Sequence, residues 1–377
     1  MKGVLDVLLF SCKFLQKVDL CKKIIELMKA LVLDEYNELN YRDFPEPEIN
    51  SDEVLIKVKA CGICGSDVHG MDGSTGRRQP PLIMGHEASG EIIETGSVVS
   101  GWKKGDKVTF DSTVYPLNDW YTLKGHYNLS DNRQVMGVSP KEFKRHGAFA
   151  DLVAVPQHIL HKIPEGVSFN EAAMVEPIAV AAHAINVSGL KPSDSAVVVG
   201  SGMVGTFVVK LLKIFGANPI IAVDIDTQKL QLAREFGADY TFNSSDRNLQ
   251  DKIKELTKNR GADLAFEVVG ITDSVSTAIS IIRKGGTVIL VGNLSPEIHF
   301  PLQKIVTQEI KVQGSCAING EYELVLDLLA AKKVDVSKMI SAVAPLSEGA
   351  DWFKRLYNKE PGMNKIILVP DNNMDSN

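Results

Sequence analysis

A glycine-rich turn constrains the fold of this chain more than any other feature of the sequence. Gly200, Gly202 and Gly205 match G-x-G-x-x-G, which follows the apolar run 196–199 and opens a helix-like pattern over 203–215. In that context the glycines permit a tight turn, close approach of the backbone to a pyrophosphate, and close packing of helix on strand. The turn therefore predicts a parallel, doubly wound α/β domain that binds a dinucleotide.

The residues after the turn extend this cofactor site. Met203 and Val204 begin the predicted helix, whose N-terminus favours phosphate. Asp224 ends the next predicted strand, where a carboxylate accepts the ribose 2′- and 3′-hydroxyls and repels a 2′-phosphate. NAD is therefore expected rather than NADP, and an ordinary aspartate at a strand end is the alternative interpretation.

Two patterns along the chain predict two domains. Short strand patterns between turn signals run from residue 28 to about 176, and apolar runs alternate with helical patterns from about 192. After Gly314 this alternation ends, but 366–369 again resembles a strand. The expected segments are an N-terminal extension (1–27) that is either a start-site artefact or a loose amphipathic arm, a mostly β domain (28–179 and 313–377) and an α/β domain (180–312).

Composition narrows the class of partner. The 377 residues carry a net charge of -6 and contain no basic run, which argues against nucleic acid or an anionic membrane as partner. No uncharged apolar run reaches the roughly 18 residues that span a bilayer. The five cysteines are an odd and sparse set, typical of a reducing compartment, so we expect a cytoplasmic protein with a small-molecule substrate.

Metal-ligand residue types lie far upstream of the glycine turn. Cys64 stands in Gly-Ile-Cys-Gly-Ser-Asp-Val-His (62–69), and His86 stands in Gly-His-Glu (85–87). A thiolate and an imidazole suit Zn²⁺, although either residue alone would more often belong to a core. Cys61 and Cys64 form a C-x-x-C pair, but no second pair exists to complete a four-cysteine site, so Cys61 is expected to be structural. A metal and a nicotinamide on one chain indicate alcohol oxidation.

Taken together, these motifs resemble the zinc-containing medium-chain alcohol and polyol dehydrogenase family, most closely its sorbitol, iditol, butanediol and threonine dehydrogenase branch. The resemblance covers residue 28 to about 370. It rests on residues 62–69, on Gly85-His86-Glu87 within 84–90, on Met174-Val175-Glu176-Pro177, on residues 200–205 and on Val223-Asp224.

The resemblance implies a fold and an activity. The fold would be a two-domain α/β architecture, with a GroES-like, mostly β catalytic domain and a Rossmann domain with a doubly wound parallel sheet. The activity would be zinc-dependent, NAD-linked oxidation of a secondary alcohol in a polyol or diol to the ketone, with sorbitol-, galactitol- or iditol-like substrates, phosphorylated or not. Threonine or butanediol dehydrogenase, a zinc-free quinone or enoyl reductase, and a non-catalytic binding protein are the alternatives. Relatives are dimers or tetramers, so a homo-oligomer is expected.

The resemblance also implies which residues hold the metal. Cys64 and His86 would be zinc ligands, with Glu176 or Glu87 as the acidic ligand. A single carboxylate keeps the metal site neutral, so we hypothesise that the two glutamates alternate in the inner sphere. The alternative for Glu176 is a carboxylate favoured at a helix N-terminus.

Other residues are implied to support the reaction. Ser66 and His69 would carry the alcohol proton to solvent, against the alternative of a turn serine and a surface histidine. Asp67 would accept the free N–H of His86, or else stabilise a turn. Lys229 would reach the ribose edge of the cofactor.

Two further features concern a second metal and a phosphate. Many relatives carry a structural zinc on four cysteines, but Pro116, Asp119, Thr122 and Ser130 stand in those places here. We therefore expect one zinc per chain and a lobe held by packing of Trp120, Tyr121 and Tyr127. Arg77 and Arg78 are either solvated surface charges or a clamp for a phosphorylated polyol.

Overall fold

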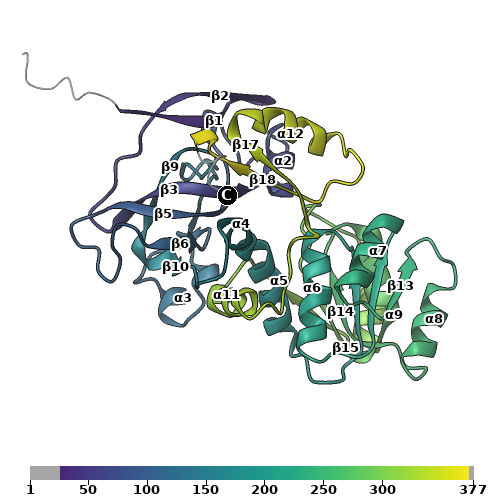
Figure 1. The fold of residues 1–377 in the computed structure, drawn as a ribbon. Coiled ribbons are helices and arrows are strands. Elements are labelled where there is room, and N and C mark those ends of the chain that lie inside the picture. Colours follow the sequence, from purple (N-terminus) through teal and green to yellow (C-terminus); the bar gives the residue numbers. More distant parts are fainter. Residues whose placement is uncertain (1–25, 373–377) are drawn as a thin grey trace, which may run out of the picture.

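The computed structural model describes residues 26–372, which form two regions with separate main sheets (Figure 1). A region around a mixed sheet lies at the upper left of the view, and a region around a parallel sheet lies at the lower right. The expected N-terminal extension, apart from residues 26 and 27, lies outside the described residues.

The parallel sheet has six strands in the order β13-β12-β11-β14-β15-β16, and every neighbouring pair is parallel. In chain order within this sheet the arrangement is 3-2-1-4-5-6, the order of a dinucleotide-binding doubly wound sheet. The predicted α/β fold is thereby confirmed. The strands are β11 (Ala196–Val199), β12 (Ile220–Asp224), β13 (Tyr240–Asn243), β14 (Ala262–Glu267), β15 (Ile282–Leu290) and β16 (Lys311–Gly314).

Apolar side chains cover both faces of this sheet. Ala196 and Val198 of β11 lie in one hydrophobic core with residues of α5, α6 and α7, whereas Val197 and Val199 lie in another with residues of α8 and α9. Because successive side chains of a strand point to opposite faces, a strand that is apolar throughout needs helices on both sides. The helices that contribute side chains to these two cores are α5 (Val175–Ser188), α6 (Met203–Ile214), α7 (Thr227–Phe236), α8 (Leu249–Leu256), α9 (Thr272–Ile281), α10 (Leu302–Thr307) and α11 (Tyr322–Ala330).

The mixed sheet joins strands that are far apart in the sequence. Its order is β10-β6-β5-β3-β18-β17, with β9 also paired to β3. Residue Leu368 of β18 lies opposite Cys61 of β3, so the end of the chain completes the sheet begun near residue 53. The strands are β3 (Glu53–Gly62), β5 (Glu87–Thr95), β6 (Lys107–Phe110), β9 (Leu152–Pro156), β10 (Leu160–Lys162), β17 (Ile340–Pro345) and β18 (Lys365–Val369).

Smaller elements surround the mixed sheet. A three-stranded sheet has the order β2-β1-β4, and a two-stranded one pairs β7 with β8. Helix α5 continues through residues 179 and 180, where the boundary between the domains is expected. The remaining elements are β1 (Leu27–Glu35), β2 (Glu38–Pro45), β4 (Leu82–Ile83), β7 (Thr113–Val114), β8 (Gln134–Val135), α2 (Gly65–Gly70), α3 (Trp120–Leu123), α4 (Phe169–Ala173), α12 (Gly349–Tyr357) and the 3-10 turns Tyr127–Leu129, Gln157–Ile159 and Leu346–Glu348.

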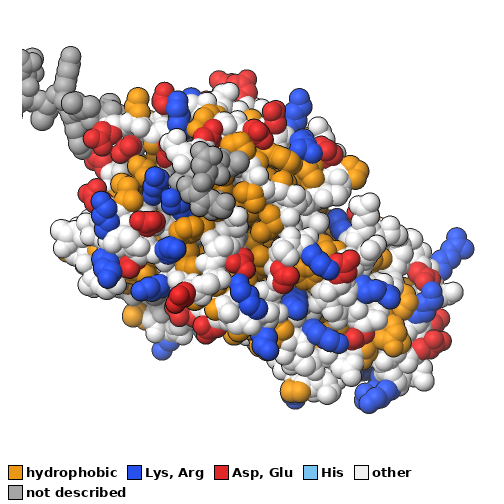
Figure 2. All heavy atoms as spheres, viewed as in Figure 1, with side chains coloured by type: hydrophobic (Ala, Val, Ile, Leu, Met, Phe, Trp, Pro, Cys, Tyr) orange, Lys and Arg blue, Asp and Glu red, His pale blue; other side chains and the backbone are white. Residues whose placement is uncertain are grey.

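The surface carries charges of both signs. Figure 2 shows acidic and basic side chains interspersed over the face in view, as the modest net charge of -6 leads one to expect. Within residues 26–372, none of the helices has the length and apolar character needed to cross a bilayer.

Candidate metal centre and cofactor site

The structure brings Cys64, His86 and Glu87 together. Their potential ligand atoms all lie within 4.8 Å of one another, and no other group of three such residues does so among the residues that the structure describes. Cys64 precedes the first residue of α2 and is half-buried, whereas His86 and Glu87 are buried where β5 begins. Sulfur, imidazole and carboxylate are the ligand types that zinc takes in proteins.

Backbone pairing sets the spacing within this cluster. Glu87 lies opposite Gly62 in the β3–β5 ladder, so His86 and Glu87 are placed beside the residues that lead into Cys64. Gly85 has a φ of +96°, and a Cβ there would lie 2.8 Å from the Cys61 sulfur. The Gly85 carbonyl accepts a hydrogen bond from the Ala148 amide at 2.9 Å. A side chain at position 85 would therefore displace the histidine that follows it.

Asp67 faces His86 in the interior of the site. The distance from Asp67 Oδ2 to His86 Nδ1 is 3.4 Å, and both side chains are buried. Burial tends to raise the pKa of Asp67, but His86 and Arg78 lower it to about 2. Burial opposes protonation of His86, but Asp67 and Cys64 raise its pKa well above the usual value. The surroundings of this imidazole thus favour a positive charge at the ring. Because Nδ1 faces Asp67, Nε2 is the atom available to a metal.

Glu87 is shared between the cluster and a buried lysine. Lys365 Nζ pairs with Glu87 Oε2 and donates to the Ile63 carbonyl at 2.8 Å, and both side chains are fully buried. The second oxygen, Glu87 Oε1, has no hydrogen-bond partner within the described part of the chain although it is buried. A buried carboxylate oxygen without a donor is costly, and a metal ion would compensate for the missing donor.

Glu176 lies beside the cluster but outside the set within 4.8 Å. It stands in the first turn of α5 and accepts a hydrogen bond from Ser112 Oγ at 3.3 Å. Burial, and then the nearby Glu87 and Asp111 carboxylates, raise its pKa to about 7 despite the presence of His86. Both interpretations of Glu176, as a helix N-terminal carboxylate and as a neighbour of the metal ligands, are compatible with this position.

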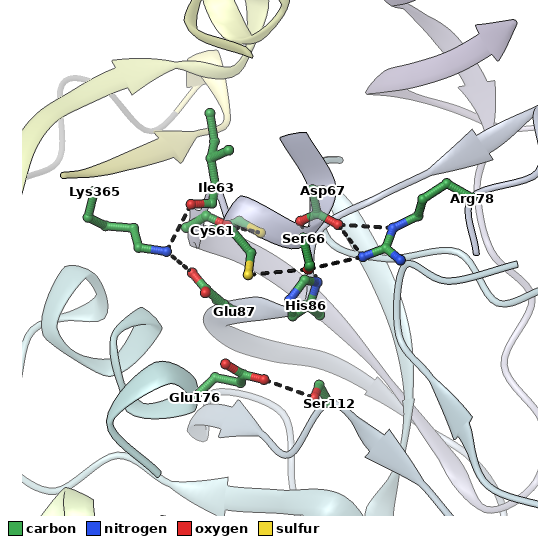
Figure 3. Close-up of polar contacts among 12 residues, drawn as sticks. Cys61, Ile63, Ser66, Asp67, Arg78, His86, Glu87, Ser112, Glu176 and Lys365 are labelled. Atoms are coloured by element: carbon green, nitrogen blue, oxygen red, sulfur yellow. Dashed lines mark hydrogen bonds and ion pairs between the residues drawn. The ribbon is translucent and has the colours of Figure 1, made fainter. Parts of the chain in front are cut away.

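The charges around the cluster suit a divalent cation. With His86 neutral, as a metal ligand has to be, and with Cys64, Asp67, Glu87 and Glu176 ionised, the site has four negative charges, whereas the buried Arg78 and Lys365 provide two positive charges. Figure 3 shows that Lys365 and Arg78 approach the cluster from opposite sides. Two negative charges therefore remain, which is the charge that Zn²⁺ would balance.

The sequence did not identify Lys365 or Ser112 as residues of the site. It suggested a surface charge or a phosphate clamp for Arg78. Lys365 begins an apolar strand, Lys-Ile-Ile-Leu-Val, where a single charged residue signals either an exposed end or a buried pair. Only the pairing of β18 with β3 distinguishes these two cases. Ser112 offers no signal in the sequence.

Ser66 and His69 lie three residues apart on α2, so they share one face of the helix, and both are exposed. Ser66 Oγ lies 3.3 Å from Cys64 Sγ, to which it is placed to donate. A hydroxyl is therefore adjacent to the cluster and an imidazole is exposed to solvent one turn further along. The helix brings together the two groups that were expected to carry a proton.

The glycine turn has the expected connection between strand and helix. Gly200 has a φ of +96°, and a Cβ at Gly205 would lie 1.9 Å from the Gly200 carbonyl oxygen, whereas a Cβ at Gly202 would meet no atom within 4 Å. Gly205 thus permits the helix to pack on the turn, and Gly202 keeps the outer side of the turn open. Met203 and Val204 occupy the first two positions of α6.

Asp224 is placed at the end of β12, beside the glycine turn. Its Oδ2 accepts from the Ser201 amide at 2.6 Å and its Oδ1 accepts from the Asp226 amide at 2.9 Å. The carboxylate is therefore held against the turn by two backbone donors. Lys229 lies exposed in the first turn of α7.

Alanine substitutions at the two glycines should separate folding from cofactor binding. Gly205→Ala should lower the melting temperature by about 5 °C, because its Cβ would overlap the Gly200 carbonyl and overpacking costs about 1–3 kcal/mol. Gly202→Ala should melt within about 1 °C of the wild type but lose most of the thermal shift that added NAD produces. Equal destabilisation by both changes would contradict these assignments.

The lobe of residues 116–130 is held differently from the prediction. Trp120 packs edge-on against Tyr121, with ring centroids 5.0 Å apart, but it is 66% exposed and therefore contributes little buried surface to the lobe. Asp119 instead caps α3, accepting from the Thr122 amide at 2.9 Å, and pairs with the Ser130 hydroxyl. Three of the four positions that carry cysteine in many relatives therefore form a hydrogen-bonded cluster. The expectation for Tyr127 is met, since it stacks on Tyr115 at 4.2 Å.

Neither expectation for the arginine pair fits Arg78. Arg77 is exposed, as expected of a surface charge. Arg78 is only 3% exposed and forms an ion pair with Asp67 at 2.7 Å, so it is neither solvated nor free to clamp a phosphate. The sequence could not reveal this difference, because the two arginines are adjacent and chemically identical.

Comparisons with known proteins agree with this geometry. Residues 50–165 match a family model described as "Alcohol dehydrogenase GroES-like domain", and residues 204–331 match one described as "Zinc-binding dehydrogenase". Sorbitol dehydrogenase of Bacillus subtilis (strain 168) is 33% identical over 348 residues, which are 91% of this chain and 98% of the relative.

Two solved structures have the same fold. Galactitol-1-phosphate dehydrogenase from Escherichia coli superposes with a TM-score of 0.84 at 28% identity, covering 91% of this chain and 100% of its own. A putative zinc-binding dehydrogenase from Sinorhizobium meliloti 1021 bound to NADP superposes with a TM-score of 0.82 at 28% identity, covering 92% of this chain and 100% of its own. The mixed-sheet region and the parallel-sheet region of this chain therefore have the GroES-like and Rossmann folds of zinc-binding dehydrogenases.

Proposed function

Because this chain belongs to the zinc-containing medium-chain alcohol and polyol dehydrogenase family, we propose that it oxidises a secondary alcohol of a polyol or diol to the ketone, using one zinc ion and NAD. The observation that carries the proposal is the cluster of Cys64, His86 and Glu87 beside two exposed proton-carrying groups on α2. A protein that only bound ligands would not need this arrangement.

Cys64 and His86 would hold the zinc ion, and Glu87 or Glu176 would supply the third protein ligand. When bound, zinc acts as a Lewis acid on the substrate hydroxyl, and NAD accepts the hydride of the carbinol carbon. The unpartnered Glu87 Oε1 and the excess of two negative charges support a divalent ion at this place. Lys365 and Ser112 each hold one glutamate, so exchange between Glu87 and Glu176 would require one of these contacts to open.

Ser66 would accept the proton of the substrate hydroxyl. Its oxygen lies 3.3 Å from the Cys64 sulfur, which places it next to the proposed metal ligands. His69, exposed on the same helix face, would release the proton to solvent. Asp67 would keep His86 oriented with Nε2 available, as carboxylates do for metal-bound histidines.

The glycine turn and Asp224 would bind the dinucleotide. Gly200, Gly202, Met203, Val204 and Gly205 would surround the pyrophosphate at the N-terminus of α6. Asp224 would accept the ribose hydroxyls and disfavour a 2′-phosphate, and Lys229 would lie at the ribose edge. The NADP-bound relative makes this preference for NAD a point to be tested.

Several properties of the whole protein belong to the same proposal. Residues 28–179 and 313–377 would form the catalytic domain, and residues 180–312 would form the NAD-binding domain. The lobe without cysteines at 116–130 supports one zinc per chain. We further propose a dimer or tetramer in the cytoplasm, for which the three free cysteines of the described residues are in keeping with a reducing compartment.

A substrate screen on purified protein tests the proposal. NAD reduction would be measured with sorbitol, galactitol, iditol, their phosphates, butanediol and threonine, and zinc would be measured in the same sample. We expect turnover with at least one polyol or diol and one zinc per chain. Activity without metal would favour a quinone or enoyl reductase, and NAD binding without any turnover would favour a non-catalytic protein. Because Arg78 is engaged with Asp67, Arg77 is the member of this arginine pair that could contact a phosphate.

A further inference from the structure

We propose that Arg78 is a positioning residue of the metal site, which fixes the carboxylate of Asp67 and the hydroxyl of Ser66 on α2. The inference rests on the proposed function, since it takes His86 as a metal ligand. Arg78 lies outside every motif that carries the resemblance to the family, and it reaches the site from the loop that precedes β4.

The guanidinium contacts two neighbouring residues of the site. Arg78 Nε and one terminal nitrogen lie 3.2 Å and 2.7 Å from Asp67 Oδ1, and the same terminal nitrogen lies 3.3 Å from Ser66 Oγ. Figure 3 shows these contacts as dashed lines that run from the guanidinium of Arg78 to Asp67 and Ser66, both on α2. Because a guanidinium is planar and rigid, its two donors to Oδ1 hold that oxygen in place and restrict rotation of the carboxylate.

Asp67 transmits this constraint to the proposed ligand. The two oxygens of Asp67 have different partners. Oδ1 accepts hydrogen bonds from Arg78, and Oδ2 lies 3.4 Å from His86 Nδ1. A free carboxylate would rotate about its last bond, whereas one held at Oδ1 keeps Oδ2 directed at the imidazole. Arg78, Asp67 and His86 therefore form a line of contacts that ends at the imidazole whose Nε2 would bind the metal.

The fold itself keeps Arg78 in place. The backbone on either side pairs with Ser139, through Gln79 N to the Ser139 carbonyl and Ser139 N to the Arg77 carbonyl, each at 3.0 Å. The side chain lies over Gly70, where an added Cβ would be 2.5 Å from Arg78 Cγ. The last residue of α2 therefore has no side chain where the arginine passes. Arg77, one residue earlier, is exposed and serves as a natural control.

Zinc affinity of the full-length protein tests the inference. Apo-protein of the wild type, Arg78→Met, Arg78→Lys and Arg77→Met would be titrated with zinc against a chromogenic chelator. Cobalt-loaded samples would be compared by their visible absorption, which reports the geometry of the ligands. We expect Arg78→Met to weaken zinc binding by about 10–100-fold and to alter the cobalt spectrum, as loss of a supporting contact does in other metal sites. Arg77→Met should stay within about twofold of the wild type, and Arg78→Lys should lie between, since it keeps the charge but not the planar fork.

A second pair of variants tests the position of Arg78 while keeping its side chain. Gly70→Ala should displace the arginine and weaken zinc binding, whereas Gly65→Ala, at the other end of α2, meets no atom within 4 Å and should not. At saturating zinc, Arg78→Met should also lower kcat while leaving KM for NAD unchanged, because Ser66 loses a partner but the glycine turn does not. Wild-type zinc affinity and an unchanged cobalt spectrum in Arg78→Met or Gly70→Ala would overturn the role of Arg78. A wild-type protein that binds no metal would instead overturn the proposed function.

Discussion

Replacing Cys64 with serine is expected to reduce the zinc content from one ion per chain to almost none and to lower kcat/KM by at least about 1,000-fold. The thiolate is the one soft ligand of the cluster, so its loss should release the metal. The Lewis acidity of the metal lowers the activation free energy by several kcal/mol, and about 1.4 kcal/mol corresponds to a factor of ten in rate. His86→Ala should have a similar effect, because it removes Nε2, the imidazole nitrogen available to the metal. Metal analysis and steady-state kinetics on the same samples check both changes.

Cys61 provides the matched control for this experiment. It lies three residues before Cys64, but it is buried, and burial raises the pKa of its thiol well above the usual value, so it stays neutral. Cys61→Ala should therefore keep its zinc and most of its activity, at the cost of a small cavity. Loss of zinc in Cys61→Ala alone would show that the C-x-x-C pair is the metal site. Full activity in a metal-free Cys64→Ser protein would refute the proposed mechanism.

Asp224→Asn should convert the preference for NAD into near indifference between NAD and NADP. The substitution keeps the shape of the side chain but removes the charge that would repel a 2′-phosphate and weakens the hydrogen bonds to the ribose. Hydrogen bonds to charged groups contribute about 1.5–3 kcal/mol, so the ratio of kcat/KM values for the two cofactors should shift by roughly 100-fold. The measurement is that ratio, taken at saturating substrate.

Asp226→Asn is the control for Asp224→Asn. Asp226 caps α7 by accepting from the Gln228 amide at 2.8 Å, and asparagine is an equally good cap. This variant has the same loss of charge two residues further on, so it should leave the cofactor ratio unchanged. A wild-type enzyme that prefers NADP, or an Asp224→Asn enzyme with the wild-type ratio, would show that the carboxylate does not select the cofactor.

Local patterns predicted the parallel sheet well. The apolar run 196–199 coincides with β11, and the helix expected over 203–215 is α6, which ends one residue earlier at Ile214. A strand that is covered by helices on both faces is apolar throughout, and a glycine turn marks the start of the helix that follows it. These features depend on neighbours in the sequence, and that is why they could be predicted.

Contacts between residues that are far apart in the chain could not be predicted from the sequence. The distinction between Arg77 and Arg78 arises from packing against Gly70, and the burial of Lys365 arises from pairing with β3. Trp120 was expected to pack in the lobe, yet it is largely exposed, and the lobe is held by hydrogen bonds among short polar side chains together with the stacked ring of Tyr127. The resemblance to the family had pointed to Cys64, His86 and Glu87, whereas nothing had pointed to the two cations that balance them.

The insertion of β18 between β3 and β17 has a consequence for how the protein is made. Cys64, His86 and Glu87 leave the ribosome early, whereas Lys365, the cation that neutralises Glu87, follows that residue by 278 positions. A growing chain therefore lacks the counterion of Glu87 until β18 has been made. Closure of this sheet has to await synthesis of β18, and a product truncated before β18 would be a substrate for quality control rather than a smaller enzyme.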